Sequence, residues 1–493
     1  MKYRIITCIV ILTGLVSPPC YSQITESQDE LLADGHFFFQ EEDYQEAIYY
    51  FLKLEGTPYM NANIMYKIGV CYLNIPGQEH QAVPYLEKAA ENISPSYKVR
   101  SATEERAPLH TLFYLGRAYR IDNQLEKALE AFTAFKEVPR FDRLYNLAMV
   151  DNEIRACDKA KIIGDIPVPV EIVNLKEPVN TEVDNYNPVL SGDQNIMVYM
   201  TDQKFYDAIF MVERKNGLWL DPVNITPQVE SDGDAYPTCL SPDGKTLYLV
   251  RGSRNNRDIY VSSFIDGFWT KMMPLNENIN SSRAESHASI SPDGKTLYFT
   301  SNRRGGYGEM DIYLSRQDNN GQWGMAVNLG PVINTPYNEE TPFLAEDGIT
   351  LFFSSEGHYN MGGYDIFCST MENDRWTDPI NIGFPVNTTG DNLFFFPVKN
   401  GKSGYITAIR PEGLGGKDIY YINILEGNVM QGTGSSGTFK GPEAAGAHTI
   451  IFVTDERTGE KLVKIVYDRN RNEFRYEGLK PGYKIKVEKA EQE

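Results

Sequence analysis

The stretch SPDGKTLYFTSNRRGGYGEMDIYLSRQDNNGQW, residues 291–323, decides the fold of this 493-residue chain. It contains an Asp-Gly turn, a hydrophobic strand, a Gly-rich loop, a strand that opens on Asp311 and a strand that ends at Trp323. Asp-Gly favours a hairpin turn because glycine tolerates a positive φ. Similar sequence motifs recur as SPDGKTLYLV at residues 241–250 and as AEDGITLFFS at residues 345–354. The recurrence predicts a repeated antiparallel unit.

The aspartate that opens the DI strand recurs with a period of about 50 residues. The five strands read DAIFM, DIYVS, DIYLS, DIFCS and DIYYI, at successive intervals of 51, 53, 54 and 53 residues. All four tryptophans lie 11 or 12 residues after one of these aspartates. Because each unit supplies four strands, five units predict an all-β five-bladed propeller. Residues that repeat in every blade are expected to be structural; they are Asp207, Asp258, Asp311, Asp365, Asp418, Trp219, Trp269, Trp323 and Trp376.

The segment before the first unit predicts how the ring closes. Each outer strand leads into a similar connection, such as VNLGPVINT at residues 327–335, and the same pattern appears as VNLKEPVNT at residues 173–181. We therefore expect residues 168–176 to supply the fourth strand of the last blade, which removes exposed sheet edges. The fifth unit has no tryptophan after it for the same reason. A six-bladed ring would need a further blade with no such aspartate.

The repeated motif SPDGKxLYFxS…DIY resembles that of the PD40 (WD40-like, TolB-type) β-propeller family. The resemblance covers residues 166–425 and is specific for the fold. It does not specify a function, because one fold hosts many unrelated activities.

An α-helical region precedes the propeller. Residues 31–162 show helical periodicity, and three segments share small residues 12 or 13 positions apart, which are Gly35 and Ala47, Gly69 and Ala82, and Gly116 and Ala128. The first two glycines are 34 residues apart, so the region resembles the tetratricopeptide family. We expect a tetratricopeptide-repeat domain at 23–163, with an insertion at 91–108 and a capping helix at 144–162. Its groove would bind a peptide or a helix; the alternative is a spacer.

The N-terminus predicts export. An apolar run at residues 5–16 follows two basic residues and is too short to span a membrane comfortably. Small side chains at Cys20 and Ser22 place signal-peptidase cleavage after Ser22, so 1–22 is the expected signal peptide. The alternative is a lipoprotein acylated on Cys20, which the preceding Pro18-Pro19 disfavours. No later apolar run is long enough for a transmembrane segment.

The C-terminal region is expected to form a small β domain. Residues 426–446 are rich in Gly, Ser and Thr and predict a linker. Residues 447–493, with the PGYKIKVEK ending, resemble the carboxypeptidase-regulatory-like β-sandwich family but are short for it, with strands expected at 448–454, 461–467, 473–476 and 484–488. The order of modules resembles PorE-type periplasmic envelope proteins of Bacteroidota, which function in type IX secretion. Those proteins usually add an OmpA-like domain that binds peptidoglycan, so direct peptidoglycan binding is not expected here.

The search for catalytic residues centres on the inner strands. Five-bladed propellers include glycosidases, which place two carboxylates around the channel. The equivalent row here has one carboxylate and reads Tyr186, Tyr236, Ser286, Glu340 and Leu393. Glu339 and Glu340, near Asp391, could form a carboxylate cluster, but we expect them to be solvated rim charges. The candidate channel-facing binding residues are Tyr186, Tyr236, His287 and Glu340. With a single carboxylate in this row, the sequence predicts no enzyme. Histidines and cysteines show no metal-ligand spacing, so it also predicts no cofactor and no metal, and the thiols are expected to be buried and free.

The charge balance and the blade loops narrow the function. A net charge of -20 without Lys or Arg clusters argues against nucleic-acid binding. Function is expected where the blades differ, in the 303–309 and 357–363 loops and the channel row. The sequence thus predicts a periplasmic protein–protein interaction scaffold, holding envelope proteins or peptides on its repeats and propeller. The alternative is a carbohydrate-active or glycan-binding five-bladed propeller.

Overall fold

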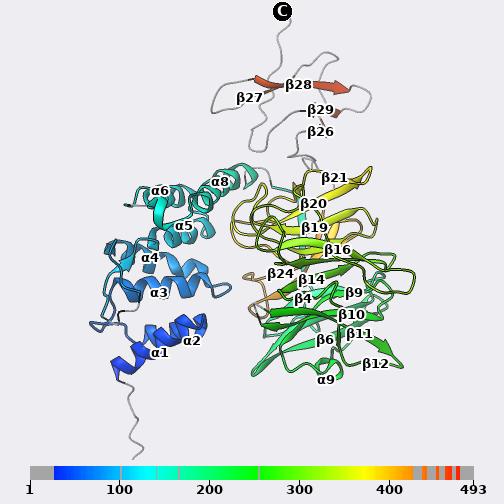
Figure 1. Ribbon diagram of the computed structural model, residues 1–493, viewed down its shortest axis with the longest axis horizontal. Coiled ribbons are helices and arrows are strands. Elements are labelled where there is room, and N and C mark those ends of the chain that lie inside the picture. Colours follow the sequence, from blue (N-terminus) through cyan, green and yellow to red (C-terminus); the bar gives the residue numbers. More distant parts are fainter. Residues whose placement is uncertain are drawn as a thin grey trace, which may run out of the picture.

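The computed structural model describes residues 27–99, 101, 103–139, 141–164, 167–253 and 256–425, together with four C-terminal strands. Helices are stacked beside a propeller of small sheets (Figure 1). The expected signal peptide and Cys20 lie outside the described residues. Within those residues, no helix combines the length and the apolar character that crossing a membrane requires.

The helical part consists of three pairs of helices followed by a final long helix. The pairs are α1 (Gln28–Gln40) with α2 (Tyr44–Leu52), α3 (Ala62–Leu73) with α4 (Ala82–Ala90), and α5 (Thr111–Ile121) with α6 (Leu125–Lys136); η1 (Glu79–Gln81) precedes α4, and α7 (Phe141–Leu144) and α8 (Leu147–Gly164) follow. Gly116 lies against the Phe132 ring with no room for a Cβ. Gly35 and Gly69 make equivalent contacts with Phe51 and Leu86. The insertion at 91–108 contributes a short parallel pair, β1 (Ile93–Ser94) and β2 (Ala107–Pro108).

The propeller has five antiparallel blades, which confirms the predicted fold class. The first blade consists of β4 (Asn185–Leu190), β5 (Ile196–Gln203), β6 (Tyr206–Lys215), β7 (Leu218–Trp219) and β8 (Val223–Asn224), and the second of β9 (Ala235–Leu240), β10 (Thr246–Ser253), β11 (Asn256–Ile265), β12 (Phe268–Trp269) and β13 (Met273–Pro274). The third blade consists of β14 (Glu285–Ile290), β15 (Thr296–Ser301), β16 (Asp311–Arg316) and β17 (Val327–Asn328). The fourth consists of β18 (Glu339–Leu344), β19 (Thr350–Ser355), β20 (Asp365–Glu372), β21 (Arg375–Trp376) and β22 (Ile380–Asn381). A short helix, α9 (Thr226–Val229), follows β8.

The fifth blade closes the ring as the sequence predicts. Its order is β23 (Phe396–Val398), β24 (Ser403–Ala408), β25 (Asp418–Ile424) and β3 (Val170–Asn174). The outermost strand therefore comes from the segment before the first blade, and its five residues pair with β25, with Ile172 opposite Ile422. Pairing of the two ends leaves neither end of the propeller chain as an isolated edge.

The tryptophans join neighbouring blades. The Trp269 indole N–H points at the Met211 sulfur of the preceding blade, 3.4 Å away. Trp323 belongs to the cluster that contains Tyr248 and Val250 of the blade before it. Trp376 is half-buried, and the centroid of its ring lies 6.4 Å from that of Tyr298 in the preceding blade. Trp219 is also half-buried and packs against a cluster that includes Tyr405 of the last blade. The period seen in the sequence thus reports on contacts between blades.

We expect Trp323→Ala to lower the free energy of unfolding by about 3–5 kcal/mol, because a buried aromatic side chain leaves a cavity. Trp219→Ala, at a half-buried equivalent position, should cost clearly less. Urea unfolding of both variants measures the difference. Equal losses would show that burial does not set the contribution of these residues.

The C-terminal strands form one sheet in the order β26 (Ser436–Lys440), β29 (Glu473–Glu477), β28 (Lys461–Asp468) and β27 (Ile451–Thr454). Strand β26 lies inside the segment that the sequence predicts to be a linker, and it pairs with β29. The rest of that segment and the expected strand at 484–488 lie outside the described residues. The four described cysteines are free thiols; Cys71, Cys157 and Cys239 are buried and Cys368 is half-buried.

Candidate functional site

The repeated aspartates hold the Gly-rich loops of the later blades. The buried Asp311 carboxylate accepts the backbone N–H groups of Tyr307 at 2.6 Å and Gly308 at 2.9 Å, and the Asn328 amide at 2.7 Å. Asp418 accepts an equivalent set of three donors. In blades one and two the corresponding strands start before the aspartate, within long hairpins. Asp207 and Asp258 lie within these hairpins and are only half-buried.

Asp365 of the fourth blade has one donor fewer. Its carboxylate accepts the Met361 backbone N–H and the Asn381 amide, both at 2.7 Å. Its second oxygen, Oδ1, is buried without a hydrogen-bond partner. Burial raises the pKa of Asp365 from 3.8 to about 8. The glycine that would complete the set, Gly362, adopts a φ of 131° and lies beside the Arg120 guanidinium.

The raised pKa predicts a pH dependence of stability. A carboxyl whose pKa is higher in the folded state than in the unfolded state stabilises the fold while it is protonated. Its contribution is therefore complete below about pH 4 and is lost as the pH rises towards 8. We expect Asp365→Asn to flatten the fall in stability over that window, measured as melting temperature against pH. A slope that is unchanged in the Asp365→Asn protein would contradict the assignment.

Four blades contribute side chains that meet in the channel. The His287 ring nitrogen Nδ1 lies 2.5 Å from the Glu340 carboxylate, which also accepts the Ser286 hydroxyl at 3.1 Å. The centroid of the His287 ring lies 4.9 Å from that of Phe394 and 5.7 Å from that of Tyr236. The structure thus brings together three of the four predicted channel residues, on β9, β14 and β18, and adds a phenylalanine that the sequence reasoning missed.

A repeated distortion of the inner strands explains the missed residue. Asn187, His287, Thr341 and Phe394 each follow a member of the predicted inner row, and each has a positive φ between 46° and 58°. Positive φ is costly for residues other than glycine, most of all for a β-branched threonine. The bulges interrupt the alternation that assigns neighbouring residues to opposite faces, so two successive side chains can turn inward.

The electrostatics of the cluster favour an ionised Glu340. Burial is the largest single influence and opposes ionisation. The His287 ring, together with the Arg257 guanidinium and the Ser286 hydroxyl, outweighs it, so the pKa of Glu340 lies below its ordinary value. A carboxylate of this kind can accept hydrogen bonds or pair with a cation, but it is a poor proton donor at neutral pH.

Two sequence-based assignments near the channel change. Glu339 is fully buried and accepts hydrogen bonds from Thr335 and Ser355, and burial raises its pKa to about 7. The Glu340 side chain is only 12% exposed, so the expectation of solvated rim charges is wrong for both residues. Tyr186 lies outside the cluster, with the Lys417 ammonium 5.1 Å from its ring centre. Among the described residues, no three His, Cys, Asp or Glu side chains gather in a way that could hold a metal ion.

The 357–363 loop joins the propeller to the helices. Met361 is 2% exposed and belongs to the hydrophobic cluster of the helical part. The Asn152 amide donates to the Glu356 carbonyl at 3.0 Å, and the Lys159 ammonium lies 4.7 Å from the centre of the Tyr359 ring. This loop was predicted to carry function because it differs from its counterparts, and the structure shows that it contacts α5 and α8 of the helical part.

A buried arginine lies at the centre of this contact. Arg120 of α5 is 1% exposed and donates from Nε to the Glu153 carboxylate of α8 at 2.8 Å. It also donates from its terminal nitrogen to the Thr389 carbonyl in the propeller, and the Thr389 hydroxyl returns a hydrogen bond to the Ile121 carbonyl at 3.2 Å. A buried charge paired on both sides of a boundary resists separation of the two parts, because separation would leave it unpaired.

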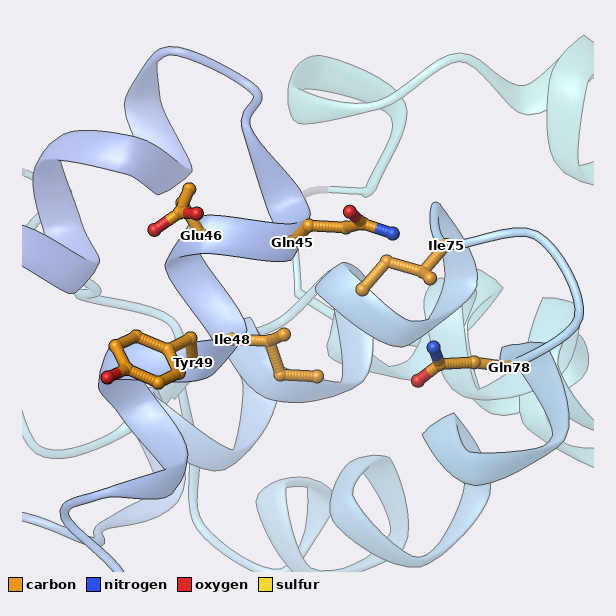
Figure 2. Close-up of a pocket in the computed structure, with 6 residues that line it drawn as sticks. All are labelled: Gln45, Glu46, Ile48, Tyr49, Ile75 and Gln78. Atoms are coloured by element: carbon orange, nitrogen blue, oxygen red, sulfur yellow. The ribbon is translucent and has the colours of Figure 1, made fainter. Parts of the chain in front are cut away.

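A pocket of about 560 Å³ lies on the helical part, between α2 and the turn that joins α3 to η1 (Figure 2). Gln45, Glu46, Ile48 and Tyr49 line it from α2, and Ile75 and Gln78 line it from the turn. Ile48 and Ile75 are buried, whereas Tyr49 is 55% exposed. Nothing in the sequence marked this pocket, because its two walls are separated by a whole helix.

Comparison with known proteins gives a similarity of fold. No known protein family and no curated protein matches the sequence. Among solved structures, TolB from Acinetobacter baumannii is 16% identical over 56% of this chain and 68% of its own, with a TM-score of 0.33. An α-L-arabinofuranosidase from Podospora anserina, in complex with cellotriose, is 11% identical over 51% of this chain and 93% of its own, also with a TM-score of 0.33. Similarity at this level carries no argument about substrate or partner.

The same comparison contradicts the prediction that the chain is not an enzyme. Several of the similar chains are α-L-arabinofuranosidases, at 9% to 13% identity. The prediction rested on a single carboxylate in the inner row, which described one ring of residues and not the whole channel. It is therefore not retained.

Proposed function

We propose that the protein is a binding scaffold of the cell envelope, in which the helical repeats and the propeller act as one body that holds protein partners. The observation that carries the proposal is the interface at Arg120, whose buried guanidinium donates hydrogen bonds both to the helical part and to the propeller. A flexible tether would not need a buried charge at the boundary. Partners bound to the two parts would be held at a defined distance from each other.

The envelope location rests on the apolar N-terminal segment, which supports export. The more specific role is membership of an outer-membrane or type IX secretion complex. It is supported by the order of modules, with tetratricopeptide-like repeats before the propeller and a regulatory-like β domain after it.

In-cell crosslinking of the tagged full chain, followed by affinity purification, tests the scaffold. Both the tagged wild type and the tagged Arg117→Ala variant should recover more envelope protein than an untagged strain does. Recovery of a partner that bridges both parts should fall with Arg120→Ala. Failure to enrich any envelope protein would contradict the proposal, and a partner set without secretion components would remove the more specific role.

A second function is supported by the channel cluster. Aromatic rings of Tyr236 and Phe394 beside the ionised Glu340 form a set suited to a sugar, with faces for stacking and an acceptor for hydroxyl groups. If the channel acts on a glycan, Glu340→Gln should abolish turnover of an oligosaccharide panel at an unchanged melting temperature. Glu277→Gln, an exposed position, is the control; equal turnover in both variants would exclude a chemical role for Glu340.

A further inference from the structure

The pocket in Figure 2 combines three chemical features at one place. Ile48 and Ile75 supply an apolar floor. The amide side chains of Gln45 and Gln78 come from opposite walls and can each donate and accept a hydrogen bond. Glu46 adds a negative charge on the exposed side of α2. The volume of about 560 Å³ is that of a site for several side chains.

An aromatic surface adjoins the pocket through Tyr49. The ring of Tyr49 contacts that of Tyr50 at 5.2 Å, Tyr50 stacks on Phe38 at 5.5 Å, and Phe38 contacts Phe37 at 5.3 Å. Phe37 is 57% exposed and Tyr49 is 55% exposed. Large exposed aromatic residues that lie together are uncommon on surfaces without a partner and are enriched in interfaces.

The charge around this surface selects the partner. Residues 27–56, which include α1 and α2, carry eight acidic side chains and one basic side chain, whereas the whole chain has 67 acidic and 47 basic residues. The one basic side chain is Lys53, whose ammonium lies 4.1 Å from the centre of the Tyr49 ring. The local excess is therefore much greater than the average. A second copy of this chain, with a net charge of -20, would meet like charge here.

We propose that the pocket and its aromatic rim bind a segment of a partner protein that carries an apolar anchor side chain next to basic residues. The anchor lies on Ile48 and Ile75, the Gln45 and Gln78 amides pair with the backbone of the segment, and its Lys or Arg side chains lie by Glu46. The proposal rests on the scaffold function and specifies the chemistry of one partner. It places binding on α2 and the turn after α3.

Selection from a random peptide display library against the full chain tests the proposal. The enriched peptides should share an apolar residue flanked by Lys or Arg. Their affinity should fall at least about tenfold with Tyr49→Ala and with Glu46→Lys, and the effect of Glu46→Lys should shrink at high salt. Melting temperatures of both variants should match the wild type, because both side chains are exposed.

Matched controls lie on the propeller. Phe205→Ala removes an aromatic side chain that is 86% exposed, and Glu277→Lys reverses an exposed charge; neither should change the affinity. Enrichment of neutral or acidic peptides, no enrichment, or peptides that bind Tyr49→Ala and Glu46→Lys as well as the wild type would each overturn the proposal. If these occur while crosslinking still recovers envelope partners, the scaffold stands and its binding site lies elsewhere.

Discussion

Replacing residues 170–174 with a Gly/Ser segment of the same length is expected to destroy cooperative unfolding of the propeller. The five residues of β3 pair with β25, so the exchange removes the last strand of the fifth blade. It also removes the Asn174 amide that donates to the buried Asp418 carboxylate at 2.7 Å. The free energy of unfolding should fall by an amount on the order of 5 kcal/mol, which is comparable with the whole stability of a domain.

Chemical denaturation and light scattering measure this effect. The variant should unfold at lower denaturant with a broadened transition and should aggregate through the exposed edge of β25. The control is the same Gly/Ser exchange at residues 318–322, an exposed turn of equal length. A variant that lacks β3 but unfolds at the wild-type midpoint would show that ring closure does not stabilise the propeller.

Arg120→Ala is expected to lower the free energy of unfolding by about 3–5 kcal/mol, because removal of one partner leaves a buried charge unpaired. The Glu153 carboxylate, with a side chain 14% exposed, loses its 2.8 Å contact, and the Thr389 carbonyl loses its donor. The propeller should then move relative to the helices, which small-angle scattering detects as a larger radius of gyration.

Arg117→Ala is the matched control for this prediction. Arg117 lies on the same helix and pairs with the same Glu153, but the separation is 3.7 Å and its side chain is 35% exposed. Exposed pairs contribute about 0–1 kcal/mol, so its loss should be small. If the two arginine variants lowered the free energy of unfolding by similar amounts, the interface between the helices and the propeller would not depend on the buried guanidinium.

The repeated features of the molecule could be predicted from the sequence. Asp311 and Trp323 recur in register because each blade repeats the same contacts with its own loop and with the preceding blade. The connection at residues 173–181 resembles those of the other blades because it serves the same purpose, and this predicted the closing strand. Gly35 predicted a close helix pair because the contact lies within one repeat.

Other features depended on local distortion. The inner row predicted Tyr236 and Glu340, but the bulges changed which neighbours point inward and added Phe394 to the cluster. Glu339 reads as a surface charge in the sequence, yet hydroxyl groups from a neighbouring strand and a loop enclose it. A strand pattern gives alternation, and it cannot give the position at which alternation is interrupted.

The sequence by itself thus determined the helical pairs, the five blades and the closure of the ring, since short-range patterns repeated along the chain encode all three. The tertiary structure alone decided how the helices dock on the propeller and where the α2 pocket forms. Arg120 and Thr389 are 269 residues apart, and neither is a residue type that recurs at the equivalent position of the other repeats. Their contact exists because two separately folded parts meet in one orientation, which no local periodicity records.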